Sequence, residues 1–390
     1  VLCRTNDSRQ TGYDPNKVEV VLQGKLLALG ASADSIRWTS ASTTPVPGDW
    51  RGIALIGAGT VNSRLEYNAI AYAVHGVNVQ GNSPQPSYGY DGVLWVDHSS
   101  IRHSQFYGFW AANMCSATVV NSVFEQNHGA EIGVTLDSDV DVRNCFLHYD
   151  PSLGSGPVDD GIAYTVGSAG WFRRNRVAGV GMGVYCLNGS SPYMFGGDST
   201  QYGPFGRNDI LNFRNYGVRT YDEGIPELGT GTSATGIFAG RNNIYSSAFP
   251  GAVWIDHSSQ IEQLKAKHNY WGAVPPDASR FVGDIVGYSN QQHYLASFDA
   301  PAGPNPNQYY PGYQGAAPLP VLEGMLVSAQ QKEATGDIAG AIAAYRDLVV
   351  NYPWDAAARW AIGHLARIQI RQGRAADEAE FVGSVISSNA

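Results

Sequence analysis

The sequence predicts a mainly β protein, a solenoid of short stacked strands followed by a small α-helical segment. Three observations support this prediction. A loose phrase recurs between residues 92 and 271: asparagine, an apolar residue, a polar stretch, glycine and a short apolar run. Glycine is abundant, at 46 residues, and only 15% of residues are charged, which suits short strands joined by tight turns. After residue 320 the sequence becomes alanine-rich, with apolar residues at helical spacing.

The recurring asparagines are separated by 23, 31, 33, 34 and 27 residues. Irregular periods of this size are typical of a stacked array whose insertions lie in loops. Equivalent residues of successive coils lie over one another, and stacked asparagines can form an amide ladder and adopt left-handed turn conformations. We therefore interpret this column as structural. The predicted ladder consists of Asn121, Asn144, Asn175, Asn208, Asn242 and Asn269.

The chain divides into four predicted segments. Residues 1–17 form a polar, irregular lead-in, and residues 18–300 form the solenoid, which begins with alternating apolar and polar residues. Residues 301–320 are rich in Pro, Tyr, Asn and Gly and are predicted to be a semi-extended linker. Residues 321–390 form the helical segment.

Four phrases in the first 300 residues resemble a known fold family. They are IRWTSAS (36–42), GDWRGIAL (48–55), LEYNAIAYAVHGVNV (65–79) and HNYWGAVPP (268–276). Together they resemble secreted bacterial right-handed parallel β-helix proteins of the pectate-lyase-like fold. The resemblance implies a right-handed parallel β-helix over residues 18–300 and an extracellular or cell-surface protein. It implies no single activity, because the family includes lyases, hydrolases, adhesins and structural proteins.

The helical segment resembles a tetratricopeptide repeat. Gly336 lies at the expected inter-helix turn, and Pro353 ends the second helix. Ala341 and Tyr345 lie on the expected packing face. About one and a half repeats are visible, fewer than the three or so that a free-standing array needs. We therefore expect this segment to pack on the end of the β-helix or to continue in further chain.

Composition restricts the partners and cofactors. The net charge is −9 without a run of Lys or Arg, which argues against nucleic acid and anionic membranes as partners. No apolar run reaches the roughly 18 residues that a membrane span needs. The cysteines have no zinc-binding spacing. We interpret Cys115, Cys145 and Cys186 as buried free thiols, and a disulfide is the alternative.

Two acidic motifs are candidates for catalysis. Asp97 and His98 lie in a WVDH phrase that resembles the vWxDH strand of pectate lyases, but the RxPxxR phrase of those lyases is absent. A similar WIDH phrase follows 159 residues later, and a catalytic site is not expected to be duplicated so far along a solenoid. Asp159 and Asp160 precede Gly161 as in hydrolases that use paired carboxylates. In those hydrolases the paired carboxylates precede an HG phrase, whereas here they follow His128 and Gly129, and the RIK phrase of those hydrolases is absent.

A third acidic motif and one loop are candidates for binding. Asp137, Asp139 and Asp141 are either calcium ligands or solvated carboxylates. An insertion over residues 188–206 carries aromatic side chains that either stack on sugar rings or a protein, or fold back as a lid. These aromatic residues are Tyr193, Phe195, Tyr202 and Phe205.

From these features we predict a non-enzymatic scaffold at the cell surface or outside the cell. Its loops are expected to bind polysaccharide or another protein, with no cofactor. The alternative is a lyase or hydrolase acting on an acidic polysaccharide, with calcium in the lyase case. The first coil is expected to expose strand edges, which favour pairing with another chain. We therefore expect an upstream domain or a neighbouring subunit to cover that coil.

Overall fold

The computed structural model contains two compact units, Val1–Gln314 and Gly315–Ala390. The predicted linker over 301–320 lies outside the described residues. The structure describes residues 1–385 except 11, 13, 33, 82–90, 150–159, 196–197, 200–202, 205–207, 232–238, 259–261, 291, 293, 296–324, 326–327, 330–331, 334–336, 352–360, 363, 366–367, 370–371, 373 and 375–379.

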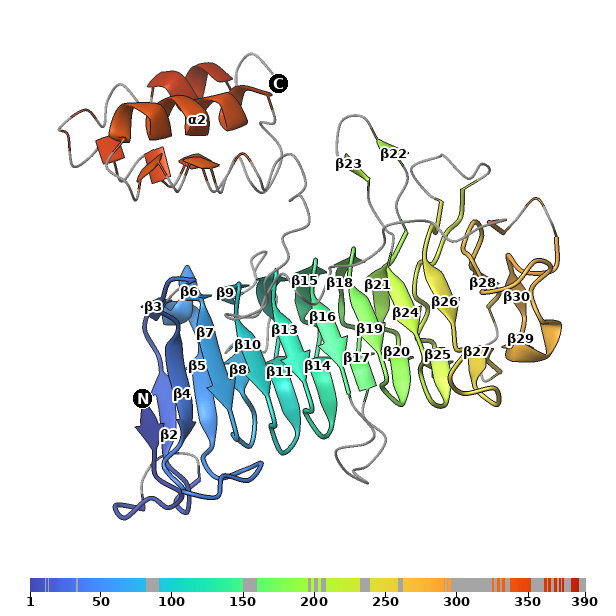
Figure 1. Ribbon diagram of the computed structural model, residues 1–390, viewed down its shortest axis with the longest axis horizontal. Coiled ribbons are helices and arrows are strands. Elements are labelled where there is room, and N and C mark those ends of the chain that lie inside the picture. Colours follow the sequence, from blue (N-terminus) through green and yellow to red (C-terminus); the bar gives the residue numbers. More distant parts are fainter. Residues whose placement is uncertain are drawn as a thin grey trace. The chain divides into compact units, whose positions relative to one another are not determined.

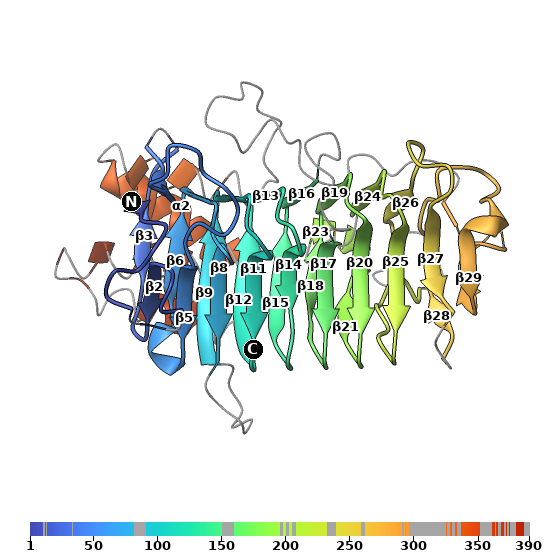
Figure 2. The same cartoon turned by 90° about the horizontal axis from the view of Figure 1, so that it is seen from below.

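The first unit is built from three long sheets whose strands are all parallel (Figures 1 and 2). From residue 2 to residue 193, each circuit of the chain contributes one strand to each sheet, and the later coils extend only the nine-stranded and ten-stranded sheets. Neighbours within a sheet therefore come from successive coils. The sheets contain nine, ten and seven strands in the described part of the chain. This arrangement confirms the predicted mainly β class and is consistent with a β-helix solenoid.

The nine-stranded sheet consists of β1 (Leu2–Cys3), β4 (Ile36–Ser40), β7 (Asn68–Ala71), β10 (Ser100–Arg102), β13 (Val123–Glu125), β16 (Phe146–His148), β19 (Arg176–Ala178), β24 (Asp209–Leu211) and β26 (Asn243–Tyr245). The ten-stranded sheet consists of β2 (Glu19–Leu22), β5 (Gly52–Ile56), β8 (Val77–Gln80), β11 (Tyr107–Ala112), β14 (Ala130–Val134), β17 (Asp160–Thr165), β20 (Met182–Leu187), β25 (Tyr216–Tyr221), β27 (Val253–His257) and β29 (Phe281–Gly283). The seven-stranded sheet consists of β3 (Leu27–Leu29), β6 (Ser63–Glu66), β9 (Asp91–Asp97), β12 (Cys115–Val120), β15 (Asp139–Arg143), β18 (Ala169–Arg173) and β21 (Ser191–Tyr193).

Short elements complete the first unit. They are the antiparallel pair β22 (Asp198–Ser199) and β23 (Gly203–Pro204), the parallel pair β28 (Leu264–Lys265) and β30 (Ile285–Val286), and the 3₁₀ turns η1 (Ala58–Thr60) and η3 (Ala278–Arg280). Strands β1, β2 and β3 are edges of the three sheets, and Leu2 and Leu27 are 73% and 52% exposed there. That another chain or domain covers this coil stays a prediction.

Inward-facing and outward-facing side chains alternate along each strand of the ten-stranded sheet, and this alternation explains how the strands form. Every second side chain points inward, and the parallel register places the inward residues of successive coils over one another. Burying each such side chain stabilises the fold by roughly 1.5–3 kcal/mol. In one fully buried column every residue except a phenylalanine is β-branched, and both β-branched and aromatic residues favour strands. It consists of Ile53, Val77, Phe109, Ile132, Ile162, Val184, Val218 and Ile255.

All four cysteines are buried free thiols. Burial raises the pKa of Cys115 to about 11, and it raises the pKa of Cys145 and Cys186 as well. Because the thiolate is the reactive form, we expect the native protein to react slowly with a thiol reagent such as DTNB. All four thiols are expected to react after unfolding. A fast native phase would contradict this burial.

The second unit contains α2 (Ile338–Asn351). Asp337 caps its N-terminus, because the Asp337 carboxylate accepts a hydrogen bond from the Gly340 N–H at 3.0 Å. Ala341 and Tyr345 lie on the buried face of α2. The Tyr345 hydroxyl donates to Glu333 Oε2 at 2.8 Å. Gly336 and Pro353 lie outside the described residues, and the tetratricopeptide-like assignment stays a prediction.

Candidate functional site

The structure places the six ladder asparagines in two neighbouring columns, at the corner between the seven-stranded and nine-stranded sheets. Asn121 and Asn144 occupy the first column, in left-handed conformations with φ of 48° and 55°. Asn144 Nδ2 donates to Asn121 Oδ1 at 2.7 Å. The second column lies one position later in each coil, is buried, and contains Asn175, Asn208, Asn242 and Asn269.

Hydrogen bonds run along the buried column from coil to coil. The backbone N–H of Asn175 donates to Asn208 Oδ1 at 3.0 Å, and that of Asn208 donates to Asn242 Oδ1 at 3.1 Å. The N–H of Asn242 donates to Asn269 Oδ1 at 3.0 Å. Each side-chain amide also donates to a backbone carbonyl, as Asn208 Nδ2 does to Phe172 at 2.8 Å. These amides join the coils and face the interior, away from any surface ligand.

Asp97 and His98 form an ion pair at the end of β9. The His98 Nδ1 to Asp97 Oδ1 distance is 2.6 Å, and Asn121 Nδ2 donates to the same carboxylate oxygen at 3.0 Å. Burial alone would raise the pKa of Asp97. The nearby His98 and hydrogen bonds from His98, Asn121 and Trp95 outweigh burial and hold that pKa below its usual value. The His98 ring also stacks on Tyr67 with centroids 4.9 Å apart. The pair therefore fixes a corner of the coil.

The similar WIDH phrase lies in a different environment. Asp256 and His257 are in β27 of the ten-stranded sheet, whereas Asp97 is in the seven-stranded sheet. His257 is 1% exposed, and its ring nitrogens lie 2.6 Å from Thr220 Oγ1 and 2.5 Å from the Glu262 carbonyl. The two phrases are alike in sequence but are not equivalent positions of the solenoid.

Of the predicted carboxylate pair, Asp160 is described and Asp159 lies outside the described residues. Asp160 begins β17, is 9% exposed, and lies in register with Ala130 of the previous coil. Burial first, and the Asp160 charge second, raise the pKa of Tyr107 on the same sheet. Asp97 belongs to the seven-stranded sheet and Asp160 to the ten-stranded sheet, so the two carboxylates do not lie on one sheet face.

The three aspartates of the predicted calcium motif differ in backbone conformation and in their side-chain partners. Asp137 lies in a left-handed turn with φ of 56°, before β15 begins at Asp139. Asp141 pairs with Arg143 at 3.2 Å and with Arg173 at 3.3 Å. Burial first, and the Asp141 charge second, raise the pKa of Asp139. Among the described residues, no group of three or more His, Cys, Asp or Glu side chains is arranged to hold a metal ion.

The aromatic insertion is partly described. Tyr193 and Phe195 pack around Trp171 of β18, with ring centroids 5.1 and 5.5 Å from the indole. Arg173 lies over the same indole, 4.7 Å from its centroid. Tyr193 is 39% exposed. Tyr202 and Phe205 lie outside the described residues.

An aromatic group that the sequence reasoning missed lies at the ten-stranded sheet. We name His75, Phe106, Tyr107 and Trp110 the aromatic platform. The His75 ring stacks against the other three rings with centroids 5.0 to 5.7 Å apart. Phe106 is 48% exposed. A Cβ on Gly133, the next residue in register with Trp110, would lie 2.9 Å from the Tyr107 ring, so glycine allows these rings to lie across the sheet.

The outward column of the same sheet continues beyond Trp110. The register places Gly133 and Ala163 on the next two coils, followed by Tyr185 and Arg219. The three steps from Trp110 to Tyr185 span roughly 14 Å at the usual strand spacing. A surface strip with two aromatic side chains separated by small residues therefore runs across the coils.

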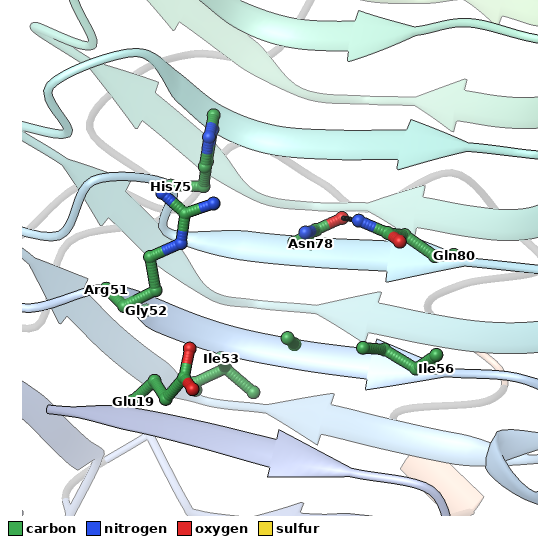
Figure 3. A pocket seen from close by; sticks show the side chains of 9 residues that line it. Glu19, Arg51, Gly52, Ile53, Ile56, His75, Asn78 and Gln80 are labelled. Atoms are coloured by element: carbon green, nitrogen blue, oxygen red, sulfur yellow. Dashed lines mark hydrogen bonds between the residues drawn. The ribbon is translucent and has the colours of Figure 1, made fainter. Parts of the chain in front are cut away.

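A pocket of about 60 Å³ adjoins the platform. Glu19 of β2, Arg51 before β5, and His75, Asn78 and Gln80 in or before β8 line it. Figure 3 shows the Arg51 guanidinium beside the His75 ring, with the Glu19 carboxylate directed toward the same side. The Gln80 amide donates to Asn78 Oδ1 at 3.3 Å. The pocket thus combines an acid, a guanidinium, an imidazole and two amides.

His75 belongs to both the platform and the pocket. Its side chain is only 9% exposed, and burial, with a smaller contribution from the Arg51 charge, lowers its pKa to about 4. The imidazole is therefore neutral near pH 7. Its Nδ1 is buried, and no group in the described part of the chain forms a hydrogen bond with it. Because buried polar atoms are nearly always paired, this nitrogen is an exception among the buried polar atoms of the described residues.

The sequence contains part of the signal for this site. Apolar Val77 and Val79 alternate with polar Asn78 and Gln80, which marks the last two as outward-facing. The platform instead depends on which residue of one coil lies beside which residue of the next, and unequal insertions hide that register.

Within the described part of the chain, no helix is both long enough and apolar enough to cross a membrane. Comparisons of the chain with protein-family models, curated proteins and solved structures find no match.

Proposed function

We propose that the first unit is a scaffold that binds an extended polysaccharide along the outer face of its ten-stranded sheet. The observation that carries this proposal is the aromatic platform beside a pocket of convergent polar groups, with His75 in both. Sugar rings have apolar faces that stack on aromatic rings and hydroxyl edges that need hydrogen-bond partners. The aromatic platform and the adjoining polar pocket together offer both kinds of contact.

The sheet face supports this proposal better than the loops do. Strands hold side chains more precisely than loops, because the ladder on both sides fixes the register. The outward column provides a further aromatic side chain at Tyr185, three coils beyond Trp110. A linear polymer can contact both positions at once, and linked contacts raise the total affinity.

The finer assignments made from the sequence are part of the proposal. They are a right-handed, pectate-lyase-like β-helix, a tetratricopeptide-like second unit, and a location at the cell surface or outside the cell. The four resembling phrases in the first unit support the fold assignment. The low content of Lys and Arg, with a net charge of −9, favours a ligand other than a polyanion.

Replacing Trp110 with alanine is expected to weaken polysaccharide binding at least tenfold, because the variant loses an aromatic surface of the platform. Binding is measured by affinity electrophoresis and calorimetry against neutral and acidic polysaccharides, with and without calcium. The matched control is Trp171→Ala, which removes an indole from the seven-stranded sheet and is expected to leave binding within about twofold.

The opposite pattern, with loss in Trp171→Ala and none in Trp110→Ala, would move the binding site to the aromatic insertion. Absence of binding to every polysaccharide would overturn the proposed function. Release of shortened or unsaturated products during the assay would show that the protein is an enzyme.

A further inference from the structure

We propose that the pocket lined by Glu19, Arg51, His75, Asn78 and Gln80 binds the hydroxyl edge of a neutral sugar residue. This inference rests on the proposed polysaccharide binding and names its substrate class: a neutral, hydroxyl-rich glycan. Trp110 and the rest of the platform contact the sugar ring face, and the pocket recognises hydroxyl groups at the ring edge.

The lining groups match a pair of neighbouring hydroxyls. A hydroxyl is both a donor and an acceptor. It can donate to the Glu19 carboxylate while a second hydroxyl accepts from the Arg51 guanidinium. The Asn78 and Gln80 amides, which also line the pocket, can provide further hydrogen bonds to these hydroxyls. Asn78 is 8% exposed and His75 is 9% exposed, so two polar side chains of the pocket are already largely desolvated and fixed in place.

The charges of the pocket disfavour an anionic ligand. Arg51 attracts a carboxylate, but Glu19 lines the same small pocket and repels it. The neutral imidazole of His75 adds no positive charge. A uronate would also lose more hydration than a neutral sugar on entering this partly enclosed site. A pair of neutral hydroxyls can contact Glu19 and Arg51 together and carries no such cost.

The test compares neutral and acidic oligosaccharides on the full chain. Mannohexaose and cellohexaose serve as neutral probes, and hexagalacturonate as the acidic probe, with affinities measured by calorimetry. At least one neutral probe is expected to bind at least tenfold more tightly than hexagalacturonate. Glu19→Ala is expected to weaken neutral binding at least tenfold. Glu19→Gln, which removes only the charge, is expected to reduce or reverse the difference between the affinity for the neutral probe and the affinity for hexagalacturonate.

The matched control is Glu66→Gln, which changes a half-buried carboxylate paired with Arg64 on the seven-stranded sheet. It is expected to leave both affinities and their ratio unchanged. Thermal unfolding of every variant shows whether the fold is kept, and His75→Gln provides a second pocket variant.

The outcomes separate the pocket from the proposed function. Neutral binding that depends on Trp110 but not on Glu19 or His75 would overturn the pocket and keep the polysaccharide-binding proposal. Tighter binding of hexagalacturonate that is lost in Arg51→Gln would replace the neutral-sugar pocket with an anion site. Absence of binding to any oligosaccharide or polysaccharide would overturn both proposals.

Discussion

Replacing Asn208 with alanine is expected to lower the free energy of unfolding by about 3–5 kcal/mol. The substitution removes the acceptor of the Asn175 N–H and the donor to the Phe172 carbonyl. It also removes the side-chain bond to Asn242. Asn208 is fully buried, so water does not replace these partners. Each buried polar group left unpaired costs about 1–3 kcal/mol.

The measurement is urea unfolding followed by the far-ultraviolet circular dichroism of the strands. Asn215→Ala is the control, because Asn215 is exposed one residue before β25 and surface changes usually alter stability by less than about 0.5 kcal/mol. A loss below about 1 kcal/mol for Asn208→Ala would show that the amide ladder contributes little to holding the coils together.

The ladder also shows how far the sequence predicts this fold. Asparagine at irregular periods is sufficient to predict stacked coils, because few other residues suit both a left-handed corner and a buried amide column. The sequence does not reveal that Asn121 and Asn144 lie one position earlier than Asn175 and its successors. Ser122 and Cys145 occupy the buried column in those coils, and neither resembles asparagine in a sequence pattern.

The candidate site was harder to predict for a related reason. Phrases that are alike in sequence need not occupy like positions, because the strands that carry the phrases ending in His98 and His257 lie in different sheets. Conversely, His75 and Trp110 lie in different phrases and stack at 5.0 Å. Contacts between coils depend on strand register, and register depends on the length of every intervening insertion.

Acid is expected to destabilise the first unit through His75, by about 3 kcal/mol between neutral pH and pH 4. The folded protein keeps the pKa of His75 at about 4, whereas the ordinary value of 6.5 applies to the unfolded chain. Between these values the unfolded state binds more protons than the folded state. Stability therefore rises with pH in this window and falls as the pH decreases through it. Above about pH 7.5 the contribution is nearly constant, because His75 is then neutral in both states.

The free energy of unfolding of wild type, His75→Gln and Arg51→Gln, measured from pH 7.5 to pH 4, tests this expectation. His75→Gln is expected to remove this part of the pH dependence, since glutamine does not titrate. Arg51→Gln is expected to keep most of it, because burial lowers the pKa of His75 more than the Arg51 charge does. Equal pH dependence in wild type and His75→Gln would show that the imidazole is protonated as readily in the folded protein as in the unfolded chain. In that case the pocket would carry an additional positive charge in mild acid and would favour anionic ligands there.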